Sequence, residues 1–191
     1  MTEKPWLMAS LIGLLSLGIG WGIGSQRPTT DGIAARTVGD YLHAVIEADR
    51  TFYTQHVVER MEAMLIVTAS EKWKEEKTLP LPVQFLREAS RGLHVRDAPF
   101  RYRLISPWPL NPQNKPASER EGQALKRVVE YGDVVEDEIV VNGKRYFQAI
   151  YPDRAVSRAC VSCHNAHPEG PKRDFKLNDV MGGLVIQVPL E

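Results

Sequence analysis

The chain has 191 residues, with 24 Lys and Arg balanced by 24 Asp and Glu, and 43% of its residues are hydrophobic. This length fits one domain, or one domain with an anchor. The balanced charge gives no basic surface of the kind that attracts nucleic acid, so we expect no nucleic-acid partner.

The first segment of the chain is apolar. Residues 6–24 contain no charged side chain, and as an α-helix they would span about 28 Å, close to the ~30 Å hydrocarbon core of a bilayer. Trp6 and Trp21 stand near the two ends, where aromatic side chains meet the membrane interface. We predict a membrane anchor over residues 1–25, with a cleaved signal peptide as the alternative.

Glycine spacing within this span bears on helix association. Gly18 and Gly22 are four residues apart, a small-xxx-small spacing that lets two membrane helices pack, although glycine is also simply tolerated in lipid. The polar residues 26–32 are predicted to be a linker, and residues 33–191 to be the domain.

The first part of this domain has a helical pattern. Between residues 33 and 77 there is no proline, and apolar residues recur at three- and four-residue spacing. We predict one long helix here, or two helices with a break near Gly39. A second helix is predicted to begin at Pro80 and Pro82 and to stop at Gly92.

The second half of the domain predicts strands. A capping box, Ser118-x-x-Glu121, opens a third helix. Two strand-like runs flank Asn142-Gly143, a dipeptide that favours the type I′ turn of a hairpin. Further strands are predicted over residues 100–106 and 182–190. Because the strands come mostly late and suit antiparallel pairing, we predict an α+β domain with three helices and four strands.

The only two cysteines of the chain, Cys160 and Cys163, stand directly before His164. C-x-x-C-H is the attachment signature of covalent haem, in which each thiol bonds one vinyl group and the histidine binds iron. The alternatives are a disulfide, a thiol redox pair, and a zinc site that also uses His167. A disulfide leaves His164 without a role, and the adjacent residues 163 and 164 rarely reach one tetrahedral zinc ion together. We therefore predict one covalent haem c.

Longer blocks around this motif resemble a known family. Residues 147–190, with the pattern YPD-AV-ACVSCHN-HP-DFK-DVMGG, closely resemble the C-terminal half of a family of single-haem c-type proteins with a PAS-like fold. The blocks RTFYTQHVVERM, LPLPVQFLREAS and LISPWPLNPQNKPASE resemble earlier parts of the same family. The resemblance implies a PAS-like domain with an antiparallel sheet and a long N-terminal helix, in a periplasmic haem protein.

The second axial position of the iron decides the function, because a strong side-chain ligand favours electron transfer and an open position allows gas or peroxide chemistry. The chain has no third cysteine for this position. We predict His56, Met61 or Met64, which lie on the mid-helix stretch that a PAS-like fold packs over its pocket, with an open position as the alternative. Less favoured candidates are His43, His94, His167 and Met181.

Other residues are candidates for the haem pocket. Arg154 and Arg158 precede the motif, and arginine pairs well with carboxylates such as the haem propionates. Solvation of both side chains is the alternative. Tyr53 and Trp108 are candidate aromatic walls of the pocket, and ordinary core packing is the alternative for each of them.

These features predict a membrane-anchored monohaem c-type cytochrome that transfers electrons. Because bacterial haem c is attached after export, we expect a single pass through the inner membrane with the domain in the periplasm, or on the thylakoid lumen side in a photosynthetic cell. A redox or gas sensor is the alternative, and a peroxidase-like enzyme is less favoured. The expected partners are the membrane through residues 6–24, a redox or signalling protein, and a second copy in a homodimer.

Overall fold

The computed structural model describes residues 32–190, so the predicted anchor over residues 1–25 lies outside the described residues. Within residues 32–190, no helix combines the length and the hydropathy that a membrane crossing requires. The elements, in chain order, are α1 (Ala35–Phe52), the π-helix η1 (Tyr53–Val58), α2 (Glu59–Ala63), β1 (Ala69–Ser70), β2 (Leu79–Pro80), α3 (Pro82–Val95), β3 (Arg101–Ile105), the 3-10 helix η2 (Pro112–Asn114), α4 (Glu119–Tyr131), β4 (Val135–Val141), β5 (Lys144–Arg154), α5 (Arg158–Ala166) and β6 (Val180–Pro189).

The main sheet has four strands in the order β3-β6-β5-β4, and every neighbouring pair is antiparallel. The β4–β5 hairpin turns at Asn142 (φ 51°) and Gly143 (φ 77°). Both central residues have positive φ, as a type I′ turn requires. The predicted α+β architecture, with an antiparallel sheet and a long N-terminal helix, is confirmed.

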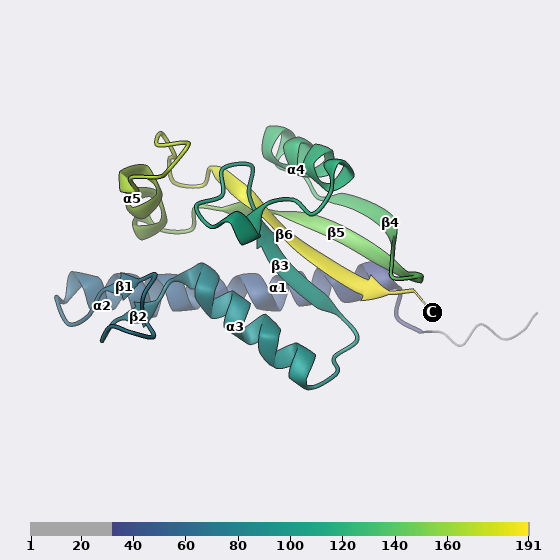
Figure 1. The fold of residues 1–191 in the computed structure, drawn as a ribbon, viewed down its shortest axis with the longest axis horizontal. Coiled ribbons are helices and arrows are strands. Elements are labelled where there is room, and N and C mark those ends of the chain that lie inside the picture. The colour runs from purple at the N-terminus through teal and green to yellow at the C-terminus, as the bar shows by residue number, and fades with distance from the viewer. Residues whose placement is uncertain (1–31, 191) are drawn as a thin grey trace, which may run out of the picture. The chain divides into compact units, whose positions relative to one another are not determined.

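Helices cover both faces of this sheet (Figure 1). Tyr151 and Leu184 point to the face on which α1 and α3 pack, where Ile46 and Leu86 join them. The next residues along the strands point to the opposite face and pack against α4; they are Ile150 and Val185, with Leu125 and Val128 from the helix. Because side chains alternate along a strand, one sheet supports two apolar layers.

The long helix is continuous from Ala35 to Ala63, through α1, η1 and α2, so the first of the two predicted arrangements is confirmed and there is no break near Gly39. Gly39 is buried against the sheet, and a Cβ there would lie 3.1 Å from Tyr151 Oη and 3.2 Å from Phe147 Cε1. The glycine therefore lets the helix approach the sheet closely. The helix ends at Ala63, earlier than the pattern over residues 33–77 suggested. The charged residues 71–77 form turns before β2 instead.

The other helices differ from expectation in two respects. α3 continues to Val95, past the predicted stop at Gly92, since an exposed glycine inside a helix costs only about 1 kcal/mol. α4 is capped as predicted, because Ser118 Oγ accepts a hydrogen bond from the Glu121 N–H (3.2 Å). A further helix, α5, was not predicted, and it carries the cysteine motif.

Candidate functional site

α5 carries both cysteines and His164 on two turns of helix between β5 and β6. Ser157 is its N-cap, and the Ser157 Oγ accepts a hydrogen bond from the Cys160 N–H (3.4 Å). A serine at this position satisfies one of the free N–H groups at the start of a helix. Pro168 follows the C-cap residue His167, which is where helices commonly stop.

Both ends of α5 are tied to the segment that leads into β6. Before the helix, the Ala155 N–H donates to Asp179 O (2.9 Å) and the Asn178 N–H donates to Ala155 O (3.0 Å). Near its end, the Asn165 amide donates to Phe175 O (2.9 Å) and accepts from the Phe175 N–H (3.0 Å). These bonds fix the motif relative to the sheet.

The three motif residues share one side of α5, because positions three and four apart are neighbours on a helix. Cys160 packs against a small buried cluster formed by Ala155, Phe175 and Met181, which Trp108 also contacts. The His164 ring meets Phe175 edge to face, with 6.0 Å between the ring centroids. Cys163 is the more exposed of the two thiols.

Neither cysteine is in a disulfide. Within residues 32–190, no group of three or more His, Cys, Asp and Glu side chains is arranged to hold a metal ion. His167 has other contacts, since its Nδ1 accepts from the Glu169 N–H (3.2 Å) and its Nε2 lies 3.8 Å from Glu71 Oε1. His167, the fourth ligand in the zinc alternative, therefore has contacts of its own.

The electrostatics of the motif favour a neutral imidazole. Burial lowers the pKa of His164, and the Asp153 carboxylate only partly offsets this. Asp153 is itself engaged by the buried Arg50, whose guanidinium lies 2.5 Å away. Desolvation raises the pKa of the Cys163 thiol, and the carboxylates of Glu62 and Glu71 raise it further.

This donor set fits a covalently attached haem. The two thiols are free, and they lie on the same side of one helix as the imidazole. A neutral imidazole keeps the nitrogen lone pair that iron needs. Among residues 32–190, the His164 ring makes neither a hydrogen bond nor an ion pair that would compete with a metal.

The four candidate pocket residues have different surroundings. Trp108 lies beside the motif, in the cluster that Cys160 contacts, and Arg158 is exposed on the first turn of α5. Arg154 is occupied elsewhere, because its guanidinium donates to Asn178 O (3.1 Å) and Gly132 O (3.2 Å). The Tyr53 hydroxyl donates to Pro80 O (2.7 Å), and the Tyr53 ring stacks on Phe85.

The segment that follows α1 lies beside α5. The Gln55 side chain donates to Val156 O (2.8 Å), just before α5, and Glu62 and Glu71 act on the Cys163 thiol. Of the three ligand candidates on this segment, Met61 is half-buried, whereas His56 and Met64 are exposed. The His56 ring contacts Phe52, with 4.9 Å between the ring centroids.

The less favoured ligand candidates are dispersed. His43 stacks on Tyr151 under the sheet, with 4.0 Å between ring centroids and 7° between the ring planes. Met181 is buried in the cluster that Cys160 contacts. His94 lies in a separate region, at the end of α3.

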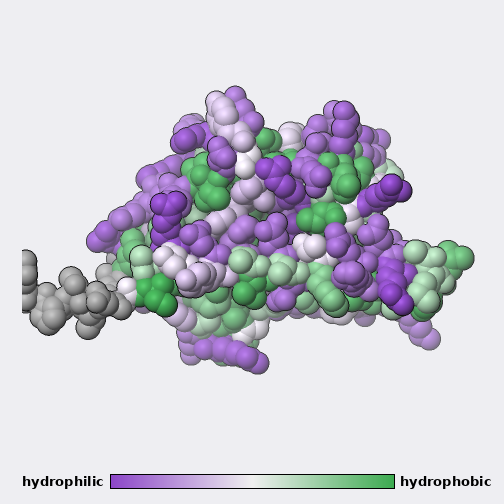
Figure 2. Space-filling model, turned by 180° about the vertical axis from the view of Figure 1, so that it is seen from behind, coloured by the Kyte–Doolittle hydropathy of each residue, from purple (hydrophilic) through white to green (hydrophobic). Residues whose placement is uncertain are grey.

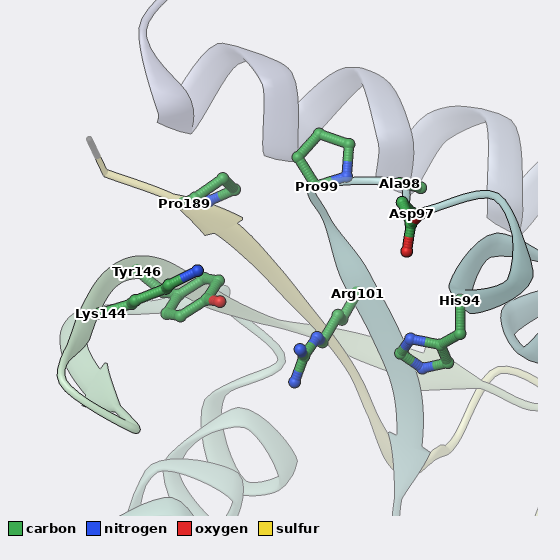
Figure 3. Close-up of a pocket in the computed structure, with 8 residues that line it drawn as sticks. All are labelled: His94, Asp97, Ala98, Pro99, Arg101, Lys144, Tyr146 and Pro189. Atoms are coloured by element: carbon green, nitrogen blue, oxygen red, sulfur yellow. The ribbon is translucent and has the colours of Figure 1, made fainter.

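A cavity of about 340 Å³ lies near His94 (Figure 3). The residues that line it are His94, Asp97, Ala98, Pro99, Arg101, Lys144, Tyr146 and Pro189. Met181, at the beginning of β6, lies in the cluster that Cys160 contacts, whereas Pro189 stands at the end of that strand. At about 3.3 Å per residue, the two regions are roughly 30 Å apart. The cavity is therefore separate from the cysteine motif.

Sequence reasoning missed several residues that shape the site. Ser157 had a detectable signal, because a serine three residues before Cys160 fits an N-cap. Asn165 gave no such signal, since its partner, the Phe175 backbone, lies in a loop. The proximity of Glu62 and Glu71 to Cys163 depends on folding alone.

Comparison with known proteins gives one family match. A family model described as Tll0287-like matches residues 33–189. No curated protein matches the chain. One similar solved structure is that of the cyanobacterial heme-protein Tll0287, with 11% sequence identity and a TM-score of 0.44; the match covers 82% of this chain and 96% of that chain.

Proposed function

The chain belongs to the Tll0287-like family, and we propose that it is a haem protein in which Cys160 and Cys163 carry one covalent haem c and His164 binds the iron. The observation that carries this proposal is the placement of two free thiols and an imidazole on one side of α5. The family shares its name with Tll0287, a cyanobacterial heme-protein.

Haem would supply one-electron chemistry, and the protein would supply its position and surroundings. Ser157 and Asn165 hold α5 in place, so that the thiols and the imidazole keep one orientation. Trp108, Phe175 and Met181 provide an apolar surface beside Cys160. Arg158 is free to pair with a propionate, since it is exposed on the first turn.

Met61 is the sixth ligand that we favour. It is half-buried on the segment that lies beside α5, whereas His56 and Met64 are exposed. Val58, three residues before Met61 on the same helix face, is buried, which indicates that this face is turned inward. His56 and Met64 stay as alternatives.

We further propose a PAS-like domain, anchored in the inner membrane by residues 6–24 and exposed to the periplasm, that transfers electrons to or from a redox partner. The histidine and methionine candidates on the segment after α1 support a six-coordinate haem. The second candidate function is a haem-based redox or gas sensor that acts through a partner protein. An enzymatic role is not proposed.

Attachment of the haem can be tested by mass and absorption. The full chain is produced in a host with cytochrome c maturation machinery, and we expect an intact mass raised by one haem and a c-type spectrum. Cys160→Ala combined with Cys163→Ala should abolish the added mass. Ser162→Ala, an exposed position between the cysteines, is the matched control and should keep the haem. Colourless protein with the unmodified mass would refute the proposal.

A further inference from the structure

The outward face of α1 carries a row of apolar side chains. We call this row the α1 seam, and it consists of Tyr41, Val45, Ala48 and Phe52. Tyr41 is 64% exposed, Val45 60% and Phe52 62%, although Ile46 and Arg50 on the inward face of the same helix are buried. Figure 2 views the molecule from the α1 side and shows pale and green residues along this helix. Exposed apolar side chains that lie next to one another on a surface often mark an interaction site.

The spacing of the seam is that of a helix pair. The steps between its members are four, three and four residues, as in a heptad repeat. Tyr41 and Ala48 then occupy d positions, and Val45 and Phe52 occupy a positions. Val45 occupies an a position, where β-branched residues favour two strands. Val38 would extend the seam by one position, but it packs partly against the domain's own core. The seam ends at Phe52, since η1 follows and its wider turns rotate later residues out of line.

The charges beside the seam allow a second copy to bind. Asp49 is the charged residue at an e position, and in a parallel, in-register pair it would face Ala44 of the second copy. No like charges would therefore meet across the interface. Interfaces between identical chains are also more apolar than transient ones, which fits the composition of the seam.

A lipid surface fits the seam less well. Helices that lie on membranes carry Lys and Arg along the polar flanks of their apolar face. No basic residue flanks the seam at an e or g position; the residues there are Thr37, Leu42, Ala44, Asp49 and Thr51. The parallel orientation rests on the proposed function, because a membrane anchor over residues 6–24 would hold two copies in the same orientation.

We propose that two copies of this chain associate in parallel through the α1 seam. The proposal does not depend on haem, because the seam lies outside the cysteine motif. It is tested by disulfide cross-linking of the full chain in membranes of expressing cells. Tyr41→Cys and Ala48→Cys place a thiol at the two d positions, where a parallel pair brings each residue beside its own copy. Ala89→Cys, at an exposed alanine of α3, is the matched control.

We expect Tyr41→Cys and Ala48→Cys each to give at least ten times more disulfide-linked dimer than Ala89→Cys, measured above the background of the unmodified chain. Adding Val45→Glu to Ala48→Cys should reduce this yield at least ten-fold, because two carboxylates would meet in the seam. The thermal unfolding midpoint should hardly change, since Val45 is exposed. Cross-linking at only one d position, at neither, or to a protein of another mass overturns the proposal.

Discussion

Glu121 illustrates how one buried carboxylate organises its surroundings. It is 6% exposed, and its two oxygens lie 2.5 and 2.6 Å from Arg103 Nη2. One oxygen also accepts the Ala117 N–H at 2.5 Å, just before α4. The same residue therefore begins the helix and joins it to β3.

Removing the arginine leaves this carboxylate buried without its cation. We expect Arg103→Met to lower the free energy of unfolding by about 2 kcal/mol, less than for a fully buried pair because Arg103 is 36% exposed. Arg120→Met breaks the surface pair with Asp137 and should cost less than about 1 kcal/mol. Urea unfolding of both variants measures the difference. Equal costs would mean that Glu121 is solvated in solution.

His43 predicts a dependence of stability on pH. Burial lowers its pKa, and the carboxylates of Glu47 and Asp40 only partly counter this. Above about pH 6.5, the ordinary pKa, the residue is neutral in both the folded and the unfolded chain and its titration does not affect stability. Below that pH the unfolded chain takes up a proton that the folded chain resists, so the free energy of unfolding falls.

His43→Gln should therefore lose less stability than the unmodified protein when the pH is lowered from 7.5 to 5. The variant also loses the stacking on Tyr151, so the comparison is the change with pH rather than the absolute value. Urea midpoints at the two pH values measure it. His94→Gln, at an exposed position of α3, should behave like the unmodified protein. If His43→Gln loses as much stability as the unmodified protein between pH 7.5 and pH 5, His43 is not the source of this pH dependence.

At the scale of elements, the approach of β6 to β3 depends on a missing side chain. A Cβ at Gly182 would lie 2.2 Å from Ile105 O, which is backbone and cannot move aside. Gly182→Ala should therefore push the two strands apart and cost more than about 3 kcal/mol. Gly92→Ala is the matched control, since nothing lies within 4 Å of a Cβ there. It should stabilise α3 by about 0.5–1 kcal/mol. Thermal unfolding of both variants measures this: the midpoint should fall in Gly182→Ala and rise in Gly92→Ala.

Elements with a local cause were predictable. The hairpin follows from Asn142-Gly143, and the start of α4 follows from Ser118, whose hydroxyl binds a nearby N–H group. α5 was not predicted, because its apolar contacts come from distant residues, among them Phe175 and Met181. The continuity of α1 at Gly39 likewise depends on contact with β5, more than 100 residues later.

At the scale of the molecule, the site brings together segments that the sequence separates. The motif residues stand out in the sequence because C-x-x-C-H, the signature of covalent haem attachment, is local. Its surroundings were not, since Gln55 reaches Val156 and Glu62 approaches Cys163 only in the folded chain. The spacing of a motif can thus predict a cofactor, whereas the pocket around it depends on tertiary packing.

The coordination of the iron separates the two proposed functions. If Met61 is the sixth ligand, the haem should be six-coordinate and low-spin in both oxidation states, and the reduced protein should bind CO weakly, because CO must displace the thioether sulfur. Met61→Ala should then bind CO readily and change the absorption spectrum. Met64→Ala, at an exposed position one turn later, should leave both unchanged.

The outcome of the CO titration decides between carrier and sensor at the level of the whole protein. Ready binding of CO by the unmodified protein would favour a gas sensor, because an exchangeable position then exists beside the iron. If the absorption spectrum changes in Met64→Ala or His56→Ala instead, the sixth ligand is one of these two exposed residues. In that case the segment after α1 must move toward α5 when haem is attached. Because this segment continues α1, the movement would occur in the same long helix that carries the α1 seam.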